Sequence, residues 1–512
     1  MKWRIFFLFF SFLLSCSIFA QKETWNWTFG GGAGLTWRPD QLRSFTATGL
    51  NGTANITLNN LPGTFASRIN QLEGVFSMSD SEGELLFYSD GVAIWKGDHT
   101  ATPITSLLGG HRSSAQSGIV IPYPGTLNRY IVIGLGYMFA DNMGYMVVEA
   151  NSPSNVSIVR NRTAFSGHLG LLGESMTAIR HSNGIHWWII APGRANSSLI
   201  YMNAWALVPS WGVQFGTPEV TPTSINYSSI NGSQGYIKFT ANGKHFVWGT
   251  WMGGRLVYGD FDNNTGRFSN IRSIDNHGAY GVEFSLDQKY LYTTINTSTE
   301  SSTNTGLYIW DFDALLSGST SSYKEFIPNS SLYPTWSRGP GGLQIDCVGR
   351  IWMVSESNTE KNIILIDNPN EPDDLKIYLL QNFVDGVAKL GLPSFSASWW
   401  NIDIGEIETG PVLPVCKGTE ITFSVNLSSS NLSLVESIEW NFGDGTIIDD
   451  PNVSAAISRK YIYAKRGTYI LTLTPKKLGG EVITEAVKTL SVKINSCQLP
   501  VNHNISVMGY YD

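Results

Sequence analysis

Three oxygen-bearing side chains alternate along one short stretch of the chain. Asp260, Asp262 and Asn264 stand two residues apart, which is the spacing of ligands in loops that bind calcium. The distal glutamate that completes an EF-hand loop is absent, so a polar hairpin turn explains the same residues. We expect no cofactor, and Ca²⁺ is the one alternative that this stretch leaves open.

The positions of two histidines and the absence of enzyme motifs also argue against a catalytic or metal-binding site. His181 and His186 flank an Asn183-Gly184 turn, a position that favours turn and strand residues over metal ligands. The sequence contains no Gly-x-Ser-x-Gly, His-Glu-x-x-His or Cys-x-x-Cys motif. We therefore predict no catalytic and no metal-binding residue, and we favour a protein that is not an enzyme.

The composition indicates which elements must position any site. The 512 residues include 52 Gly and 17 Trp, and charged residues make up only 15%. Polar turns between runs of aromatic and β-branched residues are typical of an all-β protein, and the length predicts more than one domain. The net charge of -7, with no basic stripe, argues against a nucleic-acid partner.

A repeated hairpin organises residues 74–366. An apolar strand is followed by a polar turn and a second apolar or aromatic strand; the anchors are Phe76, Ile119, Thr177, Ile237, Val282 and Leu343. Their spacings of 43, 58, 60, 45 and 61 residues each fit one β-propeller blade, which takes about 40 to 50 residues before loop insertions. Residues 24–60 and 385–400 are left over to supply a closing blade. We predict a propeller at 21–409, with seven blades favoured over six.

Residues 1–20 are typical of an export signal. A positively charged start precedes an apolar run from Ile5 to Leu14, which is too short to span a membrane. We predict cleavage between Ala20 and Gln21. In the alternative, the Leu-Leu-Ser-Cys sequence ending at Cys16 is a lipobox, and Cys16 carries a lipid anchor. Both predict an exported protein without a transmembrane span, outside the cell or on its outer surface, with the periplasm as an alternative.

A second domain is predicted at 410–499, after a stiff Gly410–Pro414 break, with a tail at 500–512. Its alternating strands indicate a β-sandwich. Its most specific motif is Trp440, Asn441, Phe442, Gly443, Asp444 and Gly445. This motif closely resembles the signature of the PKD domain, an immunoglobulin-like extracellular module, although Tyr461 stands where that family has a histidine. The resemblance implies a structural role: packed Trp440 and Phe442, then a tight turn.

Three cysteines remain after cleavage at Ala20. Cys416 and Cys497 flank the second domain and are the candidate disulfide on spacing alone. An odd number leaves one unpaired, and we expect Cys347, in an apolar run, to be a small buried residue.

The first domain also resembles large surface proteins of Bacteroidetes-type bacteria, which join a propeller-like region to PKD domains and often end in a gliding-motility-associated sorting domain. The segments that carry this resemblance are 27–35, 83–91, 113–117, 260–266 and 391–395. The residues up to Asp512 contain no such sorting domain, so we do not predict that this protein is exported by the type IX route that the resemblance implies.

These observations are consistent with two functional hypotheses. The first is a non-catalytic, exported binding or adhesion protein, in which the propeller recognises an extracellular glycan or surface protein and the PKD domain is a spacer or second contact. The alternative is a secreted polysaccharide-acting propeller enzyme, a glycosidase or lyase, which needs acidic side chains from several blades to converge.

Overall fold

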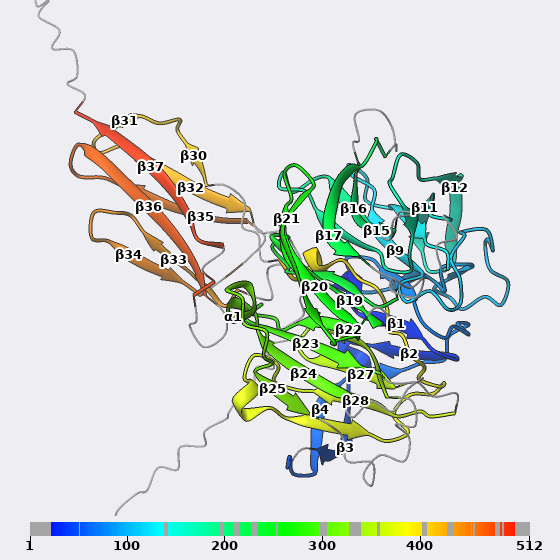
Figure 1. Ribbon diagram of the computed structural model, residues 1–512. Coiled ribbons are helices and arrows are strands. Elements are labelled where there is room, and N and C mark those ends of the chain that lie inside the picture. The colour runs from blue at the N-terminus through cyan, green and yellow to red at the C-terminus, as the bar shows by residue number, and fades with distance from the viewer. Residues whose placement is uncertain are drawn as a thin grey trace, which may run out of the picture.

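The computed structural model describes residues 22–50, 52–137, 142–194, 199–207, 215–226, 234–251, 254–296, 305–326, 339–355, 359–401, 407–426, 435–451, 453, 456–476, 482–483 and 486–496. They fold into two β units (Figure 1). Within them, no helix has the length and apolar character that a membrane span requires. The predicted signal, with Cys16, Ala20 and Gln21, lies outside the described residues, as do Cys497 and the tail.

The first unit is built from seven sheets within the described residues. The first two contain β1 (Asn26–Phe29), β2 (Ala33–Thr36) and β5 (Gly63–Thr64), then β6 (Phe76–Ser79), β7 (Leu85–Ser89) and β8 (Ile94–Lys96). The third contains β9 (Gly118–Pro122), β10 (Arg129–Gly134), β11 (Gly144–Ser152) and β12 (Asn155–Ala164). The fourth contains β13 (Leu171–Leu172), β14 (Thr177–Arg180), β15 (Trp187–Arg194), β16 (Leu199–Leu207) and β17 (Glu219–Asn226).

The remaining three sheets follow the same up-and-down order. The fifth contains β18 (Ile237–Phe239), β19 (His245–Thr250), β20 (Arg255–Asp262) and β21 (Arg267–Asp275). The sixth contains β22 (Ala279–Phe284), β23 (Tyr290–Ile295), β24 (Gly306–Asp311) and β25 (Lys324–Phe326), and the seventh β26 (Pro340–Ile345), β27 (Ile351–Ser355), β28 (Ile363–Ile366) and β29 (Ile377–Leu380). Short helices are η1 (Lys22–Thr24), η2 (Pro39–Gln41), α1 (Phe312–Leu316), η4 (Pro372–Asp374) and η5 (Ala397–Trp400).

These sheets form a ring around one axis. Strands β6, β9, β14, β18, β22 and β26, which carry the six anchors of the sequence repeat, each contact the next in turn, and β1 contacts β6. This confirms the predicted β-propeller with seven blades. The closure differs from the expectation: β3 (Arg43–Leu50) and β4 (Ile56–Leu61) extend the seventh sheet by pairing with β29. Residues 385–400 contribute single bridges, such as Gly31 to Val387, and η5.

Local hydrogen bonds shape the hairpins that begin the later blades. In three of them, a polar side chain at the end of the first strand accepts the backbone N–H that starts the second: Thr240 from His245, Ser285 from Tyr290 and Asp346 from Arg350. Each turn includes a residue with positive φ, for example Gly349 at 88°, where a side chain would be strained. The residues of the turn therefore determine the shape of these hairpins locally, without contacts from other blades.

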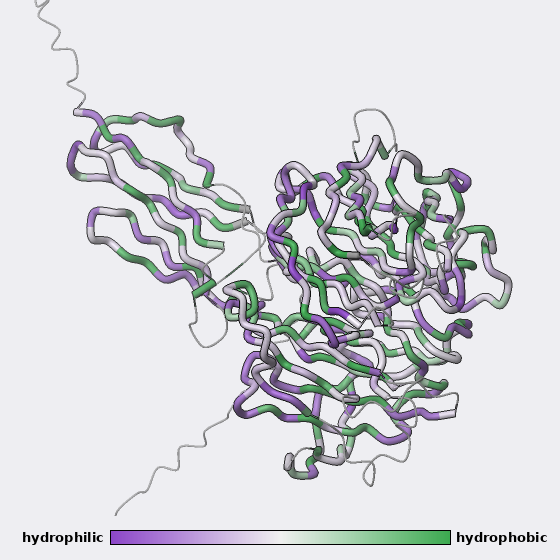
Figure 2. Tube along the Cα trace, in the orientation of Figure 1, coloured by the Kyte–Doolittle hydropathy of each residue, from purple (hydrophilic) through white to green (hydrophobic). Residues whose placement is uncertain are grey.

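Buried aromatic side chains hold neighbouring blades together. Trp27 and Trp37 have ring centroids 4.6 Å apart, and Trp37 meets Trp352 edge-on at 5.7 Å. All three are 1% exposed or less, and burying a large apolar side chain contributes about 1.5 to 3 kcal/mol. Figure 2 shows hydrophobic stretches along the strands of both units and hydrophilic residues at many turns. Cys347 is free and buried, and burial raises the pKa of its thiol well above the usual value.

The second unit is a sandwich of two sheets. One contains β30 (Glu408–Gly410), β32 (Glu420–Asn426) and β35 (Ala456–Ile462); the other contains β31 (Val415–Cys416), β37 (Lys488–Asn495), β36 (Gly467–Lys476), β33 (Ser437–Asn441) and β34 (Ile447–Asp450). Ile407 belongs to its core, so the Gly410–Pro414 break lies inside the unit, between β30 and β31. Cys416 is disulfide-bonded and lies beside Asn495 in register. Its pairing with Cys497 stays a prediction.

Candidate functional site

The chain itself occupies the axis of the propeller. After β29, residues 390–400 return to the first strands of the blades. Leu390 accepts a hydrogen bond from Gly342 of β26 at 2.8 Å and donates one to Leu72 at 3.0 Å. Farther along, Ser398 Oγ accepts the backbone N–H of Arg180 in β14 at 2.8 Å. This segment therefore links blades that the sequence places far apart.

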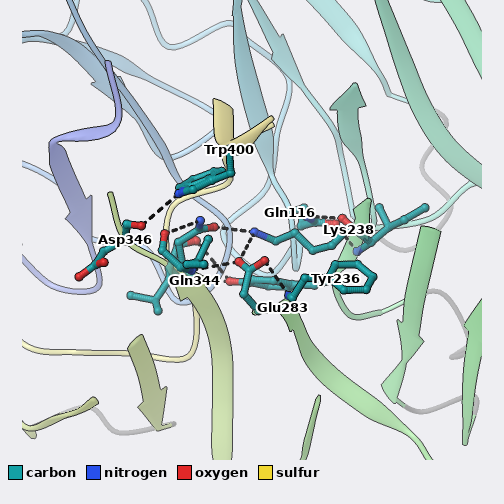
Figure 3. Close-up of polar contacts among 11 residues, drawn as sticks. Gln116, Tyr236, Lys238, Glu283, Gln344, Asp346 and Trp400 are labelled. Atoms are coloured by element: carbon teal, nitrogen blue, oxygen red, sulfur yellow. Dashed lines mark hydrogen bonds and ion pairs between the residues drawn. The ribbon is translucent and has the colours of Figure 1, made fainter. Parts of the chain in front are cut away.

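A buried ion pair lies beside this segment. Lys238 Nζ is 3.0 Å from Glu283 Oε2 and 2.5 Å from Gln344 Oε1, and Figure 3 shows the three side chains meeting from neighbouring blades. The Lys238 and Glu283 side chains are only 3% and 6% exposed. Glu283 also accepts the backbone N–H groups of Phe284 and Ile345, both at 3.0 Å.

The indole of Trp400 lies beside this ion pair and contacts a second acidic residue, Asp346. Trp400 of η5 donates from Nε1 to the backbone oxygen of Asp346 at 3.0 Å, and Trp400 with Lys238 and Glu283 lines a small cavity of about 20 Å³. The Asp346 carboxylate is fully buried and accepts from Arg350 Nε at 3.0 Å and Trp352 Nε1 at 2.8 Å.

These contacts give the axial cluster (Lys238, Glu283, Gln344 and Trp400) a structural character. A cavity of this size holds about one water molecule. Charges that are both buried and paired keep neighbouring elements in a fixed register. The cluster therefore joins three blades under the Trp400 indole.

A second polar group lies just before the first strands of four blades. We call Glu73, Gln116, Glu174 and Gln234 the glutamate–glutamine ring. Gln234 Nε2 donates to Glu174 Oε1 at 3.4 Å, and Tyr280 Oη donates to Glu73 Oε2 at 2.9 Å. Burial, together with the Glu73 carboxylate, raises the pKa of Tyr280 well above its usual value.

The charges of two of these carboxylates act on a tyrosine from the third blade. Burial raises the pKa of Tyr137, and the charges of Glu174 and Glu73 raise it further. Gln234 Oε1 is buried and has no hydrogen-bond partner among the described residues. Glu73 precedes β6 and Glu174 precedes β14, so the two acids come from different blades, as an enzyme interpretation requires.

Sequence reasoning missed both groups, although the repeat contained the signal. One residue after the anchors Ile237, Val282 and Leu343 come Lys238, Glu283 and Gln344, each inside an apolar strand. Three residues before the first four anchors come Glu73, Gln116, Glu174 and Gln234. Superposing the repeats would have revealed both sets, because equivalent positions in a ring of blades face the same axis.

His277, just before β22, makes stability depend on pH. Its ring is 6% exposed and lies 2.8 Å from Thr293 Oγ1, and burial lowers its pKa to about 4. Between about pH 6.5 and 4 the unfolded chain binds a proton that the folded one does not, so stability falls as the pH drops through this window, by about 3 kcal/mol. Urea titrations from pH 4 to 7 should show this slope in the native protein and lose it in His277→Asn. An unchanged slope in the variant would contradict the assignment.

The candidate calcium stretch folds as a hairpin turn between β20 and β21. Asp262 accepts the Asn264 backbone N–H at 2.9 Å and the Thr265 hydroxyl at 2.7 Å. Asp260 Oδ1 is 2.9 Å from His245 Nδ1. Within the described residues, no group of three or more histidine, cysteine or acidic side chains is arranged to hold a metal ion.

The two histidines of the Asn183-Gly184 turn lie where predicted, between β14 and β15. The His181 ring stacks on Trp188 with centroids 5.6 Å apart, and His181 Nδ1 accepts the Asn183 backbone N–H at 3.1 Å. His186 Nδ1 lies 3.1 Å from Asn183 Nδ2. The Asn264 backbone, in the turn between β20 and β21, also bonds His181.

Two grooves lie between neighbouring blades. The first, of about 360 Å³, is lined by residues that include Arg38, Phe65, Glu84 and His99. The second, of about 330 Å³, lies between the sixth and seventh blades and includes Lys324 and the Asp373-Asp374 pair of η4.

The signature of the second unit forms its core and one turn. Trp440 and Phe442 are fully buried, and Gly443 and Gly445 have φ of 78° and 98°. Tyr461 stacks on Phe442 at 3.8 Å and donates to Asp444 Oδ2 at 2.7 Å. Burial would raise the pKa of Asp444, but hydrogen bonds from Tyr461 and Thr446 outweigh it and lower that pKa.

Residues 406–492 match the family model described as the PKD domain. The second unit is a PKD domain. In this PKD domain Tyr461, which stands where the family has a histidine, connects β35 to the turn of the signature through its hydrogen bond to Asp444. Asn441 and Gly443 complete that turn, since Asn441 Oδ1 accepts the Gly443 N–H at 3.0 Å.

Most of the chain is similar to several solved structures at low identity. A periplasmic gluconolactonase from Pseudomonas aeruginosa shares 10% identity, covers 83% of this chain and 96% of its own, with a TM-score of 0.38. A Lactobacillus plantarum protein shares 13%, covering 73% and 88%, also at 0.38. The extracellular domain of a putative hybrid two-component system from B. thetaiotaomicron shares 12%, covering 92% and 57%, at 0.32. No curated protein matches the chain.

Proposed function

We propose that this protein is an exported, non-catalytic binding protein in which the propeller recognises a ligand outside the cell. The observation that carries the proposal is the occupied axis. Tyr236 Oη exchanges hydrogen bonds with Leu392 at 3.2 and 2.9 Å, beside the Lys238–Glu283 pair. A ligand therefore meets the rims and grooves of a rigid ring, where loops carry specificity.

The PKD domain has the role of a spacer or second contact in this proposal. It has a core of its own, formed around Trp440, Phe442 and Leu471, and separate cores are what two independently stable modules require. The export signal predicted at 1–20 and the extracellular character of PKD domains support a place outside the cell or on its surface.

The test is a binding and cleavage assay on the full mature chain. Soluble polysaccharides and isolated bacterial surface proteins are presented, and retained ligand is measured together with new reducing ends and product mass. We expect retention of at least one ligand without shortened products, with and without Ca²⁺. Shortened products that disappear with an axial acid variant would overturn the proposal.

The enzyme alternative rests on Glu73 and Glu174. If these carboxylates act on a glycan, the double variant Glu73→Gln and Glu174→Gln abolishes product formation, because amides neither donate a proton nor attack. We expect the native protein and this variant to give equal, background levels of reducing ends, as measured over the same substrate set. The charge-preserving variant Glu73→Asp with Glu174→Asp is the matched control for folding.

A further inference from the structure

The groove between the first two blades combines an aromatic surface with fixed polar groups. Its volume of about 360 Å³ lies near the lower end of small-molecule sites, about 300 to 1,000 Å³. Its walls include the η2 turn, the Phe65 region after β5, the turn that carries Glu84 and the turn that carries His99. The turn between β11 and β12 adds Pro153.

The aromatic surface is formed by Phe65 and His99. Their ring centroids are 5.2 Å apart at an angle of 34°. Phe65 packs closely against β2, because Gly34 has no side chain; a Cβ there would come within 2.5 Å of the ring. Burial, then the charge of Arg68, lowers the pKa of His99, so its imidazole is neutral at neutral pH.

His99 is held firmly in this position. Its Nδ1 lies 3.1 Å from Tyr88 Oη, and its backbone oxygen accepts Arg68 Nε at 2.9 Å. Its φ of 60° is uncommon for a residue with a side chain and is maintained by these contacts. The aromatic surface is therefore preorganised, which lowers the entropy cost of binding.

The polar side of the groove is a chain of ion pairs. Arg38 Nε donates to Asp40 Oδ1 at 3.3 Å, and Arg38 Nη1 donates to Glu84 Oε1. Gln41 Nε2 donates to Asp40 Oδ2 at 2.9 Å. Arg38, Asp40 and Glu84 are 35%, 59% and 44% exposed, so a ligand can reach them.

These features select one class of ligand. A sugar ring offers an apolar C–H face to an aromatic surface and hydroxyls, which both donate and accept, to amide, guanidinium and carboxylate groups. Two acids beside one arginine disfavour phosphorylated or carboxylated ligands. We propose that this groove binds a neutral sugar unit of an extracellular polysaccharide. The inference rests on the proposed binding function and names its site and ligand class.

The test compares variants of the full mature chain by calorimetry and affinity electrophoresis. The probes are a soluble β-glucan, a galactomannan and an arabinoxylan, with polygalacturonate as the acidic comparison. Phe65→Ala removes the aromatic surface, and Asp40→Ala with Gln41→Ala removes exposed polar groups without touching the core. The matched control is Tyr323→Ala, an exposed ring (42%) that donates to Asp373 in the other groove.

We expect at least one neutral probe to bind, about tenfold or more weakly in Phe65→Ala and in the double variant, and unchanged in Tyr323→Ala. Binding of a neutral probe that both groove variants retain would overturn this site while leaving the proposed function intact. Binding of polygalacturonate alone, or of no polysaccharide, would overturn the ligand class. Shortened products would instead overturn the proposed function.

Discussion

Replacing Lys238 with methionine is expected to lower the free energy of unfolding of the propeller by about 3 to 5 kcal/mol. The variant leaves Glu283 buried, at 6% exposure, without its cation. It also removes the donor to Gln344, 2.5 Å away. Urea unfolding followed by tryptophan fluorescence measures the loss.

Two further variants distinguish the loss of the buried ion pair from a general loss of stability. Lys238→Met combined with Glu283→Gln should recover part of the loss, because no buried charge remains. The recovery is incomplete because the two carboxylate oxygens accept the backbone N–H groups of Phe284 and Ile345 separately, and the single amide oxygen of glutamine accepts only one of them. Lys22→Met breaks an exposed pair, with Lys22 3.1 Å from Glu82, and should cost at most about 0.5 kcal/mol. A loss below about 1 kcal/mol in Lys238→Met would show that the pair does not join the blades.

Replacing Trp440 with alanine is expected to unfold the PKD domain selectively. Trp440 is fully buried, and removing such a side chain costs about 3 to 5 kcal/mol. This is a large fraction of the stability of a domain of this size, at about 0.05 to 0.15 kcal/mol per residue. Calorimetry of the full chain should show the PKD transition lost or far below that of the native protein.

The unfolding temperature of the propeller should not change, because the two units have separate cores. Among the described residues, Leu286 alone packs against both the PKD core and the largest propeller core. Ile470→Ala, at an exposed position (52%) of the same sheet, is the matched control and should leave both transitions nearly unchanged. Joint movement of both transitions in Trp440→Ala would mean that the units unfold together.

Short-range patterns were predictable because their causes are local. The alternation of apolar strands with turns that contain residues such as Asn242-Gly243 defined the hairpins, and their spacing gave the blades. The PKD signature was equally local: Trp440 and Phe442 are packed and Gly443 turns the chain, as the motif implies.

The axis was not predictable in the same way. Lys238 and Glu283 are 45 residues apart in the sequence. In the sequence, each is only a single polar residue within an apolar strand, and nothing local indicates that the two form a pair. The pairing of β3 with β29 and the return of residues 390–400 to the axis depend on how the ring closes, which no single hairpin encodes.

By itself, the sequence determined the β class, the repeat that forms the propeller, the PKD signature and a predicted export signal, because each depends on residues close together in the chain. Only the tertiary structure decided that the axis is filled, that Tyr280 bonds Glu73 and Gln234 bonds Glu174, and that Phe65, Arg38 and Glu84 line one groove. Those features join side chains from different blades, and their energies arise from burial and charge contacts that exist only once the ring has closed.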